Sequence, residues 1–86
     1  GQPQRADVVV HDRRAQPLLL VECKAPGQSI NQSVFDQASR YNLALGAPFL
    51  AVTNGIEHYA CRIDRSTARI DFLDDLPDFD DMCRSA

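Results

Sequence analysis

Two short apolar runs, separated by a helical pattern, constrain the fold of this chain more than any other feature. Residues 18–23 and residues 49–53 are nearly all apolar, which fits strands covered on both faces. The residues between them show apolar side chains every three or four positions, at Ile30, Val34, Ala38, Tyr41 and Leu45. This spacing predicts a helix. A strand–helix–strand order favours parallel pairing of the two strands through a right-handed crossover.

Breaker residues mark the ends of these elements. Ala25-Pro26-Gly27 interrupts the first apolar run. Either Ser29 or Asn31 is suited to cap the helix, because both side chains accept hydrogen bonds from helix amides. Gly46 stands where a helix C-terminal glycine belongs, and a proline follows it two residues later.

Further strands are predicted on both sides of this unit. Residues 6–10 are rich in valine and, after a short polar link, should form an antiparallel hairpin with residues 18–23. An Asn-Gly turn precedes a strand at residues 57–63, and residues 68–73 suit a shorter one. The fold class is therefore α/β, a mixed sheet with a packed helix in β-β-α-β-β order. Residues 1–73 form the core, and the acidic residues 74–86 form an irregular tail.

The charge is distributed unevenly along the chain. The net charge is −3, which is unusual for a protein that contacts phosphates. From Asp71 onward there are six acids and one base, whereas residues 1–70 carry eight bases and six acids. The acidity therefore belongs to the C-terminal segment, which is interpreted as a solvated surface, and the body of the chain is mildly basic.

Cysteine usage and hydropathy suggest a cytoplasmic protein. The three cysteines, Cys23, Cys61 and Cys83, have no zinc-ligand spacing and are expected to be reduced and unreactive. We see no leader at the start and no apolar run long enough for a bilayer, so no membrane association is expected.

Three charged residues lie at strand ends in a pattern that suggests chemistry. Glu22 and Lys24 are two residues apart, so strand alternation places both on one face, about 7 Å apart. If the hairpin turn centres on residues 14–15, Asp7 lies opposite Glu22, with Cβ atoms roughly 5 Å apart. A divalent cation would relieve the repulsion between two such carboxylates. The alternative is that these charges simply end their strands in water.

Gln37 falls on the apolar side of the predicted helix, one turn before Tyr41. A buried amide without partners costs about 1–3 kcal/mol, so Gln37 either reaches a polar site at the sheet edge or lies at the margin of the apolar stripe. Spacing alone does not decide between these two interpretations.

Four segments taken together resemble a known family. Arg-Ala-Asp-Val-Val-Val at 5–10, Val-Glu-Cys-Lys-Ala-Pro at 21–26, the helix segment at 35–42 and Thr-Asn-Gly-Ile-Glu-His-Tyr at 53–59 are similar to the N-terminal nuclease domain of type I restriction enzyme R subunits, especially its small stand-alone members. The resemblance implies a restriction-endonuclease-like fold of the PD-(D/E)XK superfamily. Ala6 replaces the proline of that motif, and the helix and first strand of family members would lie upstream of this chain's start.

The resemblance also implies roles for individual residues. Asp7, Glu22 and the Cys23 carbonyl would hold Mg²⁺, with Mn²⁺ as a substitute, and Lys24 would be the catalytic lysine. Gln37 would shape the site, and Tyr41 would match the helix motif of related nucleases and contact DNA, as would its neighbour Arg40. The implied activity is Mg²⁺-dependent hydrolysis of DNA phosphodiester bonds. No segment of the chain resembles a base-reading element, so little sequence preference is expected.

Two other classes of function stay open at this stage. The chain could be an inactive DNA-binding module that retains the nuclease fold. It could also be a structural module that forms a homodimer through an open sheet edge. No phosphate-binding Gly-x-x-x-x-Gly-Lys loop is present in the sequence, so nothing here suggests an ATP-driven motor.

Overall fold

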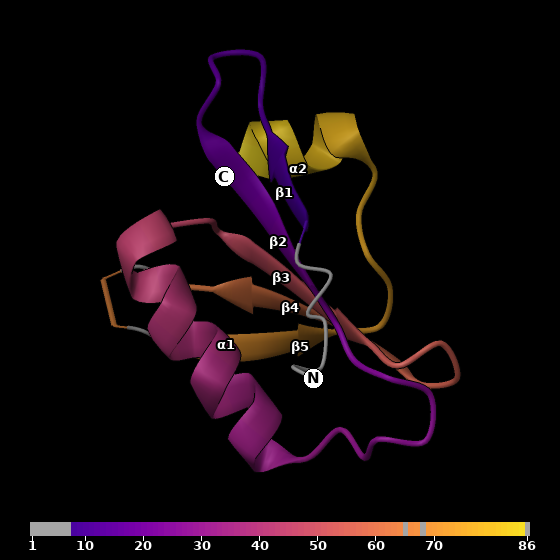
Figure 1. The fold of residues 1–86 in the computed structure, drawn as a ribbon. Helices are drawn as coiled ribbons and strands as arrows, with labels where there is room; N and C mark the ends of the chain where they lie inside the picture. The colour runs from indigo at the N-terminus through magenta and orange to yellow at the C-terminus, as the bar shows by residue number, and fades with distance from the viewer. Residues whose placement is uncertain (1–7, 65, 68, 86) are drawn as a thin grey trace.

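The strands and the central helix follow one another as the apolar pattern predicts. A computed structural model describes residues 8–64, 66–67 and 69–85 (Figure 1). The described elements follow in the order β1 (Val8–His11), β2 (Pro17–Cys23), α1 (Gln32–Leu45), β3 (Phe49–Thr53), β4 (His58–Ile63), β5 (Ile70–Leu73) and α2 (Phe79–Ser85). The strands form one mixed sheet in the order β1-β2-β3-β4-β5, in which only β2 and β3 are parallel. The predicted α/β class and the packed helix are confirmed.

The β1–β2 hairpin has the register that the sequence predicts. Val8 pairs with Val21, Val9 with Leu20 and Val10 with Leu19, and the register shifts at His11. The turn is closed by the Asp12 carboxylate, which accepts hydrogen bonds from the backbone N–H groups of residues 14 and 16. Bonds of this kind, above all the one from residue 16, lower the pKa of Asp12.

Helix α1 begins and ends where its capping residues stand. Asn31, one of the two predicted caps, accepts a hydrogen bond from the Ser33 N–H, and Gly46 has the left-handed φ of 76° that a C-terminal glycine permits. The buried face of α1 differs from the predicted stripe because it is rotated toward Phe35 and Asn42. The Asn42 amide is satisfied in its buried position, because it donates to the Ala47 carbonyl and accepts from the Ala47 N–H. Tyr41, which belongs to the predicted apolar stripe, is about half-exposed.

The two helices cover opposite faces of the sheet. On the α1 side, apolar side chains of β2, β3 and β4 pack against the helix and form the larger buried cluster, which includes Leu20, Leu50, Val52, Cys61, Val34, Phe35 and Ala38. Burial raises the pKa of the Cys61 thiol to about 11, as expected of a thiol that serves only to pack. The three cysteines are all free thiols, as predicted.

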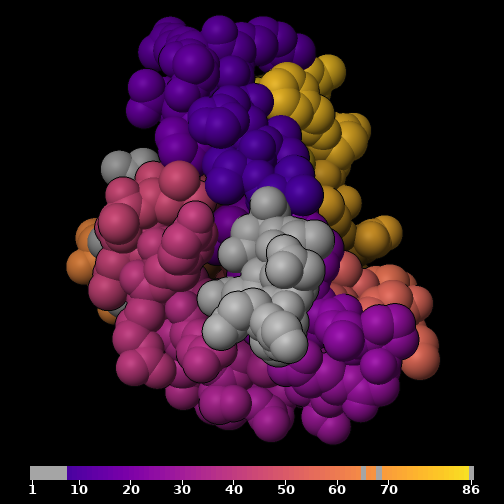
Figure 2. Space-filling view, in the orientation of Figure 1, coloured from indigo at the N-terminus to yellow at the C-terminus, as the bar shows by residue number. Residues whose placement is uncertain are grey.

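The C-terminal segment is not irregular throughout, contrary to prediction. Residues 79–85 form α2, in which Met82 is buried against Leu18, Leu19 and Phe49. Figure 2 shows the side chains of α2 beside those of the β1–β2 hairpin, where Arg13 and Asp80 form an ion pair at 2.6 Å. The acids conceal this helix in the sequence because they occupy its exposed face, and a single methionine supplies its fully buried anchor.

Candidate functional site

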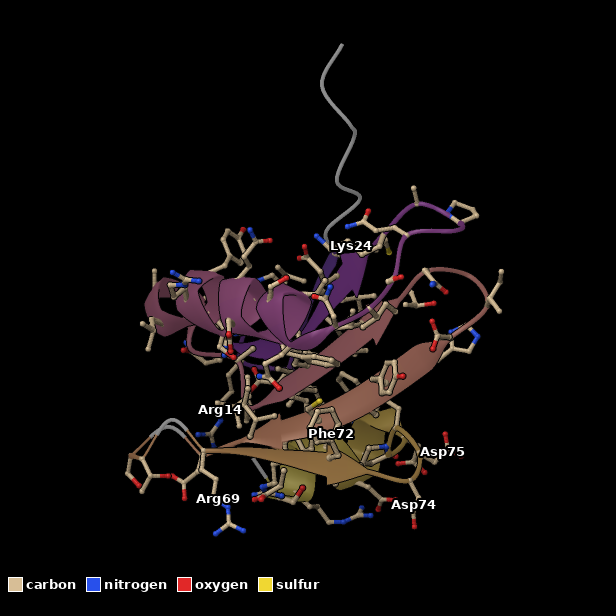
Figure 3. The ribbon with its side chains drawn as sticks, turned by 90° about the horizontal axis from the view of Figure 1, so that it is seen from below. Arg14, Lys24, Arg69, Phe72, Asp74 and Asp75 are labelled. Carbon is tan, nitrogen blue, oxygen red and sulfur yellow. The ribbon has the colours of Figure 1, made fainter. Side chains whose placement is uncertain are left out.

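A buried ion pair lies at the end of β2. The Lys24 Nζ atom is 3.1 Å from the Glu22 Oε1 atom, and the two side chains are only 9% and 1% exposed. The pair confirms that both residues lie on one face of the strand. In Figure 3, Lys24 lies on the side of the sheet that α1 covers. Charged groups this deeply buried are uncommon unless they are paired.

The parallel pairing of β2 and β3 explains where this pair lies. Glu22 pairs with Val52 and Cys23 with Thr53, and the Lys24 N–H donates to the Thr53 carbonyl at 2.8 Å. The carboxyl ends of both strands therefore meet at one edge of the sheet. In open α/β sheets, ligands commonly bind outside this edge. Glu22 and Lys24 thus occupy the part of the fold where a binding site is expected.

Asp7, the predicted second carboxylate, lies outside the described residues. The neighbouring pair, Val8 and Val21, has the register on which the prediction depends. Within residues 8–64, 66–67 and 69–85, no three His, Cys, Asp or Glu side chains gather into a ready-made metal site. The assignment of Asp7, Glu22 and the Cys23 carbonyl as metal ligands therefore stays a prediction.

The predicted helix residues lie on the exposed side of α1. Gln37 and Arg40 are exposed and Tyr41 is about half-exposed, so Gln37 lies at the margin of the apolar stripe. The Arg40 Nε–H donates to the Asp36 carbonyl at 3.4 Å. Among the described contacts, none joins these three side chains to Glu22 or Lys24. Their proposed roles therefore depend on what they would contact in bound DNA.

Asn54 is a buried residue of this edge that sequence reasoning missed. Its carboxamide oxygen accepts hydrogen bonds from the N–H groups of Ile56 and Glu57, at 2.9 and 2.7 Å. Its amide nitrogen donates to the Gln28 carbonyl at 2.9 Å, so Asn54 links the turn after β3 to the loop after Lys24. The Asn-Gly pair in the sequence indicated a turn, but not that the asparagine side chain would be buried between two loops.

A hollow of about 460 Å³ lies elsewhere in the molecule. Its walls come from the last turns of α1 and from Ile63 and Asp64, at the far end of β4. Since β4 runs antiparallel to β3, this is the sheet edge opposite the ends of β2 and β3. The hollow therefore does not coincide with the Glu22–Lys24 pair.

A family model, described as the type I restriction enzyme R protein N terminus, matches residues 1–77 of the chain. The chain belongs to this family. The resemblance inferred from the four segments is therefore confirmed, and membership indicates a restriction-related function. Comparisons with curated proteins and with solved structures give no match.

The family match includes the candidate residues at the strand ends and those on α1. It includes Asp7, Glu22 and Lys24 as well as Gln37, Arg40 and Tyr41, and it ends between β5 and α2. Helix α2 therefore lies beyond the part that resembles other R-protein N termini. Neither described helix is long and apolar enough to cross a membrane.

Proposed function

We propose that this chain is a Mg²⁺-dependent nuclease domain that hydrolyses DNA phosphodiester bonds, with Mn²⁺ as a substitute. The observation that carries the proposal is the buried pair of Glu22 and Lys24. Burying two charges costs desolvation energy, and apolar residues of similar volume often give equal or better stability. An ion pair buried where the carboxyl ends of β2 and β3 meet is therefore better explained by a role in catalysis than by a contribution to stability.

The residues around this pair fit a hard divalent cation. Glu22 offers a carboxylate oxygen, the end of β2 offers the Cys23 carbonyl, and Asp7 supplies a second carboxylate in the proposal. Mg²⁺ takes oxygen ligands and usually needs only one or two carboxylates from the protein. The chemistry that bound Mg²⁺ supplies is polarisation of the phosphate and activation of a water molecule.

Lys24 is the proposed catalytic cation. Its ammonium group is held 3.1 Å from the Glu22 carboxylate, so its position is fixed before DNA binds. From there it orients the attacking water and offsets the negative charge that develops on the phosphate. A preorganised charge in a site shielded from water is worth more than the same charge in solvent.

Helix α1 is the proposed surface for the DNA backbone. Gln37, Arg40 and Tyr41 are exposed on it and can meet phosphates or sugars, which position DNA without reading its sequence. Residues 1–70 carry eight bases and six acids, so the excess of acids lies in the C-terminal segment. Because contacts to phosphates and sugars do not read the bases, we expect little sequence preference in the DNA that is cut.

The test uses calorimetry of Mg²⁺ binding together with a plasmid-nicking assay. Glu22→Gln keeps the shape of the side chain but removes its charge, and it should abolish both saturable binding and nicking. Lys24→Met should leave binding measurable in the folded fraction, and nicking normalised to that fraction should fall by roughly 10²–10³-fold, the usual effect of removing one transition-state contact. Asp74→Asn, which changes an exposed acid beyond the end of β5, away from α1 and from Lys24 (Figure 3), is the control and should behave like the parent.

Each other outcome has a distinct meaning. Saturable Mg²⁺ binding without nicking in the parent would favour an inactive module that retains the site. Nicking that survives Glu22→Gln would contradict the proposed centre. DNA binding that requires neither Mg²⁺ nor Glu22 would favour a DNA-binding module without catalysis.

A further inference from the structure

Strand β5 forms one edge of the described sheet and leaves backbone groups unpaired. The Asp64 N–H donates to the Arg69 carbonyl at 2.9 Å, and the register then continues through Arg62–Asp71 to Ala60–Leu73. In an antiparallel pair, hydrogen-bonded positions alternate with non-bonded ones. The N–H and C=O groups of the intervening residues, Ile70 and Phe72, therefore point away from β4. An edge of this kind is a template for another strand.

The side chains along this edge combine one exposed ring with charges of both signs. Phe72 is 58% exposed although its ring packs edge-on against Phe35, at a centroid distance of 5.1 Å. Figure 3 shows Arg69 near one end of β5 and Asp74 and Asp75 near the other, with Phe72 between them. Arg69 also forms an ion pair with Asp71 of its own strand at 2.9 Å, and both side chains are exposed. The edge is therefore basic at one end and acidic at the other, a pattern that is complementary to an antiparallel copy of itself.

We propose that β5 pairs antiparallel with β5 of a second copy of this chain, with Phe72 opposite Phe72 on the two-fold axis. The outward backbone groups of Ile70 and Phe72 must face each other across the interface. Even-numbered residues therefore face even-numbered residues, and odd-numbered residues face odd-numbered ones. β5 itself ends at Leu73, and pairing that continues past both ends of the strand in the register centred on Phe72 brings Arg69 of each copy opposite Asp75 of the other. The two exposed rings then meet as a cross-strand aromatic pair, which is a favourable combination.

Charge and exposure disfavour the neighbouring registers. A slip centred on Asp71 places that acid opposite itself, and a slip centred on Leu73 places Asp71 opposite Asp75. Like charges directly opposite each other destabilise strand pairing. A register centred on Ile70 leaves the Phe72 rings away from the two-fold axis, although Phe72 is the more exposed of the two residues. The Phe72-centred register alone joins ring burial to charge complementarity.

The strand is short, with four residues from Ile70 to Leu73, so the interface is small. Contacts well below about 1,200 Å² of total buried area are typical of weak, transient association. We therefore expect a monomer–dimer equilibrium with a dissociation constant on the order of 0.1–1 mM. This pairing does not depend on the proposed nuclease activity.

Sedimentation equilibrium over a range of protein concentrations that brackets this constant tests the pairing. Arg69→Glu and Asp75→Arg should each weaken association at least about tenfold, because each places like charges opposite one another. Asp75→Arg leaves the Arg69–Asp71 ion pair of the same strand in place, whereas Arg69→Glu also breaks it. The double variant should restore it, since the two charges are then exchanged. Arg13→Glu breaks the exposed Arg13–Asp80 ion pair, far from β5, and is the control that should associate like the parent.

A monomer at every concentration would overturn the proposal. Suppose that Arg69→Glu weakens association, but Asp75→Arg alone does not weaken it and the double variant does not restore it. This result would overturn the Phe72-centred register. Association that resists both substitutions but is lost on Val8→Lys would also overturn it, and would assign the contact to the other described edge, β1.

Discussion

Two ion pairs in this molecule have similar distances but very different surroundings. Glu22 and Lys24 are 3.1 Å apart at the end of β2 and nearly inaccessible to solvent. Arg13 and Asp80 are closer, at 2.6 Å, but their side chains are 69% and 61% exposed. The Arg13 guanidinium also lies over the Phe79 ring, 5.1 Å from its centroid. One pair is part of the sheet, and the other joins a turn to a surface helix.

The comparison teaches that burial, not distance, decides what an ion pair does. Water and salt screen exposed charges, so the Arg13–Asp80 pair adds little to stability even though it is short. Buried charges are strongly coupled to each other, and removing one leaves the other in a poor environment. The Glu22–Lys24 pair should therefore dominate every measurement that compares the two.

The largest effect is expected for Lys24→Met. The substitution keeps the volume of the side chain but leaves the Glu22 carboxylate buried without the ammonium group. The free energy of unfolding should fall by about 3–5 kcal/mol, as measured by urea denaturation. The double variant Glu22→Leu/Lys24→Met should recover to within about 1 kcal/mol of the parent, because neither charge of this pair then remains buried. A single variant as stable as the parent would contradict the comparison.

A smaller effect is expected for Asn54→Ala, at the same sheet edge. Two backbone N–H groups lose their acceptor and the Gln28 carbonyl loses a donor, so the free energy of unfolding should fall by about 1–3 kcal/mol. The matched control is Gln37→Ala, which removes an exposed amide and should change stability by less than about 0.5 kcal/mol. Equal effects of the two substitutions would show that burial does not distinguish these amides.

The smallest effect is expected for Arg13→Ala. The urea midpoint at neutral pH should shift only slightly, because the lost ion pair is exposed. The Arg13 guanidinium lowers the pKa of Asp80 below its ordinary value of 3.8. A carboxyl group with a lowered pKa stabilises the folded protein above its unfolded pKa, and this contribution is lost as the pH falls through the folded pKa. The parent and variant should therefore become equally sensitive to urea in acid. A difference that grows on acidification would contradict this account.

The local elements of the fold could be predicted from the sequence because their signals are local. Apolar runs predicted β2 and β3, and capping residues predicted the ends of α1. The same-face placement of Glu22 and Lys24 follows from the two-residue period of a strand, whatever packs against it. The candidate pair was therefore accessible to sequence reasoning before its burial was known.

Other features depended on packing between distant segments. The buried side of α1 includes Phe35 because its ring meets those of Tyr59 and Phe72, which lie far away in the sequence. Nothing in the helical period of the sequence distinguishes this face from one that contains Tyr41. Helix α2 was also missed, because its burial depends on contacts with β2 and β3 that lie far away in the sequence.

The sequence by itself determined the strands, the central helix, the family and the alignment of Glu22 with Lys24, because side-chain period and capping act over a few residues. Only the tertiary structure decided that this ion pair is buried, that Asn54 joins two loops, and that Phe72 remains exposed at a sheet edge. Those properties are set by which surfaces cover one another, and the sequence specifies such contacts only through the complete fold.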